Sequence, residues 1–218
     1  MPERSAADRR ADLVTLYREL SEWQCPLAAT RTKLVFGNGN ANAELMFVGE
    51  VPGADEDRQG IPFVGRAGRL LDTLLGEIGL ERSDVFVANV LKCRPPGNRD
   101  PLPDEISECE PHLMRQIELI QPSVICTLGN FSTKLLSGSP QGITKVHGRS
   151  QAHRIGGLDV QLYPLFHPAA ALRAPGTLDL LREDFGRLPE LLGRARQPSP
   201  GAASAQPEVE TSQLDLFA

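Results

Sequence analysis

Short apolar runs alternate with amphipathic stretches along most of the chain, and this pattern predicts strands and helices in turn. The apolar runs predict buried strands at 44–48, 85–90, 124–128 and 160–166. The amphipathic stretches predict helices at 8–21, 67–78, 103–120, 130–136 and 178–194. Strands that alternate with helices form a mainly parallel sheet with helices on both faces. The expected fold is therefore a three-layer α/β domain.

Glycine and asparagine mark the expected turns between these elements. Asn38 lies between two glycines and predicts a turn. Asn130 is expected to cap the helix that follows it, and Gly156-Gly157 predicts a hairpin before the last strand.

The segment at 49–68 joins the first predicted strand to the next long helix and has the sequence GEVPGADEDRQGIPFVGRAG. It contains four acidic residues, five glycines and one aromatic residue, Phe63. Open α/β sheets bind their ligands at the carboxyl ends of the strands, so this loop is a candidate pocket. The residue types alone fit a solvated acidic turn equally well.

Three predicted strands end close to a residue with chemical potential: Glu50, Asn89 and His167. The carboxyl ends of parallel strands share one edge of a sheet, so these residues could converge there. An Asn can read an amide-like edge, a His can donate to a developing anion, and Phe63 could stack on a flat ring. Each also has a structural interpretation: Asn89 as a strand-end cap, His167 as a satisfied turn histidine, and Phe63 as a core residue.

The composition sets limits on the function. The 218 residues carry a formal net charge of −5, so any nucleic-acid binding must come from a local basic patch. No apolar stretch approaches the 20 or so residues of a membrane-spanning helix, and the N-terminus lacks a secretory signal. We therefore expect a cytoplasmic protein, in which four cysteines are more typical of metal ligands, reactive thiols or buried small residues than of disulfides.

Three motifs in order carry a resemblance: GEVPGADEDRQGIPFVGRAG, VANVLKCRPPGNRDP and PLFHPAAALR. Together they resemble the family-4 uracil-DNA glycosylases, the iron–sulfur type of bacteria and archaea, over about residues 22–193. The resemblance implies an α/β/α sandwich with a four-stranded, mainly parallel sheet. It also implies a monomeric repair enzyme that flips uracil out of DNA and hydrolyses its N-glycosidic bond, leaving an abasic site.

The resemblance assigns roles to the strand-end residues. Phe63 would stack on uracil, Asn89 would bond its O4 and N3 edge, and His167 would stabilise charge on O2. Glu50 and Glu56 match acidic positions and would position water or stabilise the sugar cation, with their roles undivided. The family-1 enzymes have an Asp where this chain has Val51, which again leaves the acid chemistry to these two residues.

The family also supplies four cysteine ligands to a 4Fe-4S cluster, the first two in a C-x-x-C motif. Cys25, Cys93 and Cys109 match the second, third and fourth ligands, and Glu22 stands in the place of the first. A carboxylate is an unusual cluster ligand. We expect a structural cluster with a weakened site; a [3Fe–4S] cluster and no cluster are the alternatives. Cys126 lies mid-strand and is expected to be a buried small residue.

DNA contacts are expected from a loop and from the residues after the His167 motif. The loop supplies Lys145, His147 and Arg149, and a solvated loop is the alternative interpretation. Leu172 is a candidate wedge into the gap left by the flipped base, and Arg173 follows it.

The chain is expected to divide into an N-terminal helix at 1–21, a glycosylase domain at 22–196 and a tail at 197–218. The tail is rich in Pro, Ser, Ala, Gly and Glu and is expected to be disordered. It ends in QLDLF, which resembles the peptides that dock on the bacterial sliding clamp. Its Gln213, Leu214, Leu216 and Phe217 would make that contact.

Two other functions compete with excision. A related branch becomes covalently trapped on uracil DNA through a His in an Arg-rich insertion near the second motif, and this chain has neither the insertion nor the His there. A non-catalytic DNA-binding protein or clamp adaptor is conceivable because one cysteine ligand is missing. The retained strand-end residues argue against it.

Overall fold

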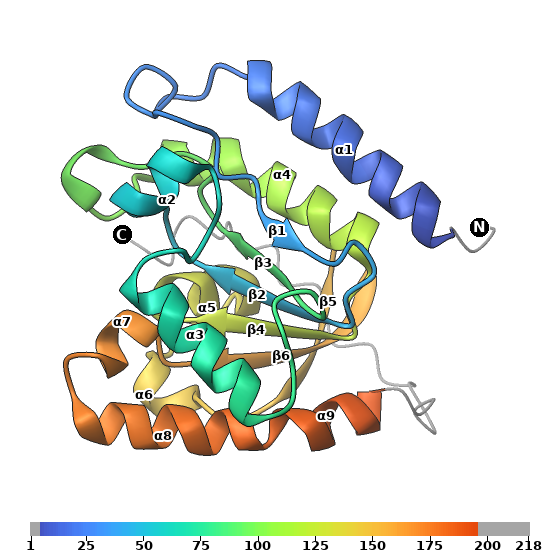
Figure 1. Ribbon diagram of the computed structural model, residues 1–218, viewed down its shortest axis with the longest axis vertical. Coiled ribbons are helices and arrows are strands. Elements are labelled where there is room, and N and C mark those ends of the chain that lie inside the picture. The colour runs from blue at the N-terminus through green and yellow to red at the C-terminus, as the bar shows by residue number, and fades with distance from the viewer. Residues whose placement is uncertain (1–4, 196–218) are drawn as a thin grey trace.

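The computed structural model describes residues 5–195, and these form a three-layer α/β/α sandwich around a six-stranded sheet (Figure 1). The strand order is β1-β3-β2-β4-β6-β5. The strands are β1 (Asn38–Gly39), β2 (Leu45–Gly49), β3 (Phe86–Asn89), β4 (Val124–Leu128), β5 (Gln151–Ile155) and β6 (Leu158–Leu165). The predicted fold class is thereby confirmed.

Helices of very different lengths connect these strands. They are α1 (Ala6–Glu22), α2 (Ala54–Gln59), α3 (Arg66–Glu77), α4 (Pro103–Ile120), α5 (Asn130–Ser137), α6 (Ile143–Val146), α7 (Pro168–Ala171), α8 (Pro175–Gly186) and α9 (Leu188–Ala195), with a 3-10 turn at Pro96–Asn98. None of the helices within the described residues is long and apolar enough to cross a membrane.

The four inner strands run parallel, and their side chains alternate between two apolar cores. In β2, Met46 belongs to the core under α1, α4 and α5, whereas Phe47 belongs to the core under α3, α8 and α9. Both side chains are fully buried. Helices on both faces bury both sides of the strands, which explains their almost uninterrupted apolar sequences.

The sheet has two more strands than the four expected from the sequence. β1 pairs antiparallel with β3 at one edge, and β5 pairs antiparallel with β6 at the other. The residues around Asn38 were predicted as a turn, but they extend along β3. Gly39 makes this possible because a Cβ there would lie 2.0 Å from the carbonyl oxygen of Val85. The hairpin at Gly156-Gly157 is confirmed.

Three local predictions differ from the structure. Gly129, at φ 97°, caps α5, while the Asn130 side chain instead accepts a hydrogen bond from the Ile143 N–H at 2.7 Å. The single C-terminal helix expected at 178–194 is two helices, α8 and α9, because Pro189 has no N–H to continue the first. The loop after β2 contains the helix α2. The sequence did not reveal this helix because it has no apolar period.

The N-terminal helix α1 packs into the same core as the rest of the molecule. Ser5 and Asp8 form a capping box at its start. Its inward face places Leu13, Leu16 and Leu20 in the core shared with α4. The predicted boundary near residue 21 therefore does not separate two cores.

Candidate active site

Two adjacent parallel strands end together at the base of the site. Gly49, the last residue of β2, is in register with Asn89, the last residue of β3. A Cβ on Gly49 would lie 2.4 Å from the Asn89 Oδ1 and 2.7 Å from the Phe63 Cε2. The absence of a side chain at Gly49 therefore lets an amide from one strand and a ring from a distant loop meet.

Phe63 lies in the turn between α2 and α3 and has an unusual backbone. Its φ is 54°, in the left-handed region that bulky residues rarely adopt, and only 4% of the residue is exposed. Gly68 in α3 packs directly on it, because a Cβ there would lie 1.6 Å from the Phe63 carbonyl oxygen. Such strain persists only where the surrounding structure enforces it.

His167 follows β6 by two residues and caps the short helix α7. Its Nδ1 accepts a hydrogen bond from the Ala169 N–H at 3.1 Å, so in the neutral ring Nε2 carries the proton. Burial, with the nearby charge of Arg173, lowers the pKa of His167 to about 4. Its ring centroid lies 5.6 Å from that of Phe63. A neutral imidazole with an N–H to donate thus stands beside the aromatic ring.

Asn89 has an unusual environment for a buried amide. It is 2% exposed, and its Oδ1 has no hydrogen-bond partner among residues 5–195. Its backbone carbonyl accepts a hydrogen bond from the Lys92 Nζ at 2.8 Å, so the strand end itself is held. A buried acceptor without a donor carries a desolvation cost of about 1–3 kcal/mol. The site therefore offers an acceptor to a ligand that brings its own N–H.

The two candidate acids have different surroundings. Glu50 directly follows β2, and burial, reinforced by the negative charge of Asp100, raises its pKa to about 7. Glu56 lies in the first turn of α2, where its Oε2 accepts a hydrogen bond from the Gly53 N–H at 2.5 Å. Glu50 thus has the protonation behaviour of a general base near neutral pH, and Glu56 is engaged in holding the loop.

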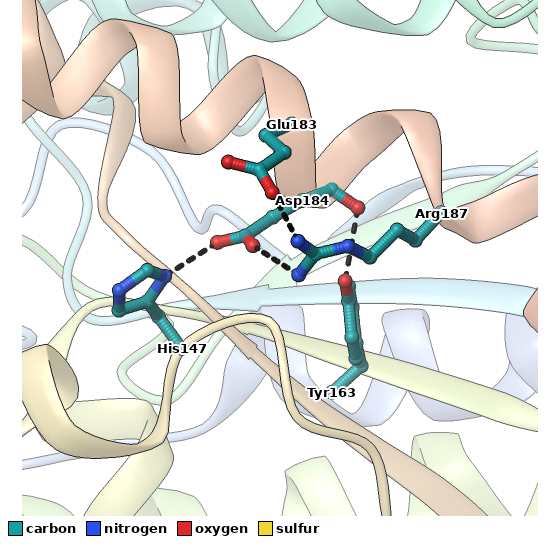
Figure 2. Close-up of polar contacts among 5 residues, drawn as sticks. All are labelled: His147, Tyr163, Glu183, Asp184 and Arg187. Atoms are coloured by element: carbon teal, nitrogen blue, oxygen red, sulfur yellow. Dashed lines mark hydrogen bonds and ion pairs between the residues drawn. The ribbon is translucent and has the colours of Figure 1, made fainter.

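His147 is the best anchored of the predicted DNA contacts (Figure 2). Its Nδ1 lies 2.7 Å from the Oδ2 of Asp184, a 2% exposed carboxylate whose Oδ1 accepts from Arg187 at 3.2 Å. Gly148 packs against this carboxylate, since a Cβ there would lie 2.1 Å from its Oδ1. The His147 ring also lies 4.4 Å from that of Phe166, the neighbour of His167. The loop is thereby fixed beside the site.

The other predicted DNA contacts lie on the surface. Lys145 and Arg149 are exposed on either side of His147. Leu172 is 40% exposed and is the C-cap of α7, five residues after His167. Arg173 is exposed and close enough to His167 to affect its pKa. A basic and apolar rim therefore borders the site.

Comparison with known proteins agrees with this geometry. The family model described as "Uracil DNA glycosylase superfamily" matches residues 36–187. The chain belongs to the uracil-DNA glycosylase superfamily. A type-4 uracil-DNA glycosylase of Sulfurisphaera tokodaii is 49% identical over 173 residues, covering 77% of this chain and 79% of the relative. Those of Archaeoglobus fulgidus and Thermotoga maritima are 44% and 48% identical and cover 81% and 68% of this chain, and 90% and 77% of their own lengths.

Two of the four cysteines meet in this member of the superfamily, and a third lies in the same core. The Sγ atoms of Cys25 and Cys93 are 3.0 Å apart, and the Arg31 Nη1 lies 3.3 Å from that of Cys93. Their hydrogen bond, assisted by the Arg31 cation, lowers the pKa of Cys25. Cys109 is buried in the same core, where burial, reinforced by the nearby Cys25, raises its pKa. Thiols from three separate segments therefore share one core.

The fourth ligand position is different. Glu22 is exposed at the end of α1. Within residues 5–195, no group of three or more His, Cys, Asp or Glu side chains is arranged to hold a single metal ion. Cys126 belongs to the core on the other face of the sheet, so it cannot replace the missing cysteine. The predicted buried position of Cys126 is confirmed.

Three residues that shape the site were not singled out from the sequence. Asp184 anchors His147, Lys92 holds the Asn89 carbonyl, and Arg82 donates to the Phe63 carbonyl at 2.5 Å. Lys92 is fully buried, and burial lowers its pKa to about 7. Its place inside the second motif was a signal. Arg82 and Asp184 lie outside the motifs and carried none.

Proposed function

We propose that this protein is a uracil-DNA glycosylase, which removes uracil from DNA by hydrolysing the N-glycosidic bond. The unpartnered Oδ1 of buried Asn89, beside Phe63 and His167, is the observation that carries this conclusion. The family membership supports it, as do the names of the relatives. The target base must leave the stack to reach these residues, since Asn89 and Phe63 are buried and do not form an extended surface.

Recognition of uracil follows from the donors and acceptors of Asn89. The Oδ1 accepts from the N3–H of uracil, and the Nδ2 donates to its O4. Cytosine presents an acceptor at N3 and an amine at C4, so both contacts would oppose like groups. Each buried mismatch costs about 1–3 kcal/mol. Selection against cytosine therefore depends on the donor and the acceptor of cytosine that the Asn89 amide cannot pair.

Cleavage uses His167 and Glu50. As the bond breaks, its electron pair goes to N1 of uracil, and the neutral His167 donates a hydrogen bond from Nε2 to the negative O2. Water then adds to the sugar carbon and gives its proton to the Glu50 carboxylate. Glu56 supports this chemistry by fixing the loop that follows Glu50.

The cysteine group has a structural role in this proposal. Cys25, Cys93 and Cys109 would hold a 4Fe-4S cluster, which would cross-link the N-terminal segment to β3 and α4. Arg31 supports the arrangement because it also donates to the carbonyls of Ser21 and Trp23, at 3.2 and 3.1 Å. The proposed reaction needs no electron transfer from this group.

DNA binding is assigned to the rim around His167. The anchored His147 and the exposed Lys145 and Arg149 would contact backbone phosphates, because cationic side chains supply most of the affinity for DNA. Leu172 would enter the gap left by the flipped base, and Arg173 would contact the adjacent phosphate.

The proposed clamp-docking residues Gln213, Leu214, Leu216 and Phe217 lie outside the described residues. We propose that they bind the bacterial sliding clamp as a short peptide on a tether. Deleting 213–218 should abolish clamp binding in a titration and leave uracil excision on naked DNA unchanged. Equal clamp affinity with and without the tail would reject this assignment.

A glycosylase assay separates the candidate functions. Oligonucleotides that contain one uracil, in single and double strands, are incubated with the purified full chain, and cytosine replaces uracil in the control. The account predicts free uracil and an abasic strand. A stable covalent adduct would indicate the trapped branch, and binding without either product would indicate an adaptor.

A further inference from the structure

Arg82 contacts the backbone of the residue that carries the active-site ring, although Arg82 lies outside the three motifs. It lies between α3 and β3, and its Nη2 donates to the carbonyl oxygen of Phe63 at 2.5 Å and of Pro62 at 3.4 Å. Its Nε donates to the Oδ1 of Asp72 at 2.7 Å, which orients the guanidinium. One side chain thus holds two successive carbonyls of the loop that carries Phe63.

That loop needs such support. Phe63 adopts a left-handed φ of 54°, which a non-glycine residue leaves readily unless its neighbours prevent it. Gly68 presses on the same carbonyl from α3, and the ring reaches Gly49 on its other side. The backbone can relax only if its carbonyl moves, and Arg82 holds that atom.

We propose that Arg82 is a positioning residue for base recognition, which acts by fixing Phe63 in the conformation that presents its ring to the flipped base. The inference rests on the proposed function, since the ring needs a base to stack on. The ion pair with Asp72 alone does not account for the role of Arg82. That carboxylate is 48% exposed, and exposed ion pairs stabilise a fold little. The two carbonyl contacts are what tie Arg82 to the site.

The first test compares Arg82→Gln with wild type in single-turnover excision of uracil from a single-stranded oligonucleotide. A misplaced reacting geometry reduces the rate more than it reduces binding, so we expect about a tenfold lower rate constant with an unchanged Kd for DNA. Arg154→Gln is the matched control. Its partner Asp159 and the residue itself are 80% and 72% exposed, so we expect the wild-type rate.

A double-mutant cycle then decides whether Arg82 acts through Phe63. In the Phe63→Ala background, Arg82→Gln should lower the rate less than about twofold, because the ring it positions is gone. The same loss in both backgrounds would overturn the proposal, and so would an equal loss in the Arg154→Gln control. An inactive wild type would instead reject the proposed function.

Thermal unfolding of each Arg82 variant shows whether it still folds, and so separates a misplaced Phe63 from a lost fold. Arg82→Lys keeps one donor for the Phe63 carbonyl and should recover most of the rate lost in Arg82→Gln. If Arg82→Gln does not fold, the cycle is run with Arg82→Met, which also removes the donors, and the same non-additive result is expected. Additive losses there would overturn the proposal as well.

Discussion

If Glu50 is the base, as proposed, its burial next to the end of β2 sets the pH range of the reaction. Its pKa is raised to about 7, while burial keeps that of His167 near 4. The rate of uracil release should therefore fall on the acid side with a midpoint near pH 7, as the Glu50 carboxylate takes up a proton. Single-turnover rates between pH 5 and 9 measure this. Glu50→Gln should be slow at every pH and should not show this fall in rate at acid pH. If the fall persisted in the variant, it would belong to another group.

For the same residue, a rise in pH that increases the rate should decrease the stability of the fold. A carboxyl whose pKa is raised from the ordinary 4.5 to about 7 keeps a proton in the folded state that the unfolded chain has lost. Folding stability therefore decreases as pH rises between these values. Glu50→Gln should become more stable than wild type across this window. Denaturant unfolding of both proteins at pH 5 and pH 8 measures the difference in their free energies of unfolding. A variant less stable than wild type at pH 8 would show that the fold stabilises Glu50 as a carboxylate.

At the scale of elements, α3 connects local packing with the active-site loop. Gly68→Ala should destabilise the fold by about 1–3 kcal/mol or more, because its Cβ would lie 1.6 Å from the Phe63 carbonyl oxygen. Uracil excision should fall as well, since Phe63 must shift. The measurements are denaturant unfolding and single-turnover rates.

Gly76 in the same helix is the matched control. A Cβ there meets nothing within 4 Å, so Gly76→Ala should stabilise the protein by about 0.5–1 kcal/mol and leave activity unchanged. Equal effects of the two substitutions would show that helix propensity, and not the contact with Phe63, dominates at both positions.

The elements differ in how far the sequence determines them. The span 103–120 was predicted correctly because α4 is long, has a proline and acids at its start and has a strong apolar period. The short helix α2 could not be found this way, since one alanine and five polar residues carry no apolar period and its start depends on the Glu56 cap. The edge strand at Asn38 also depends on a partner, because its pairing with β3 is made only in the folded chain.

At the scale of the whole molecule, the proposed cluster would join three separate segments through Cys25, Cys93 and Cys109. Glu22→Cys should restore a four-thiolate set and raise the iron and sulfide content per chain toward four of each, with a more persistent visible spectrum. Cys126→Ala, in the opposite core, should leave the content as in wild type. Unchanged iron in Glu22→Cys would mean that residue 22 does not face the thiols.

The active site was predictable only where topology decides it. Asn89 ends one predicted parallel strand and His167 follows another, so the sequence already indicated that they share an edge of the sheet. Arg82 and Asp184 act across the fold through contacts with Phe63 and His147, and no sequence spacing specifies these. The residues proposed to bind the base were therefore accessible from the sequence, and those that hold them required the folded chain.

The account depends on one buried amide meeting one flipped base. Single-turnover release of uracil from an oligonucleotide should be about 10²–10³-fold slower in Asn89→Ala than in wild type. The exposed Asn40, changed to Ala, should leave the rate unchanged. An Asn89→Ala enzyme that releases uracil at the wild-type rate would contradict the account.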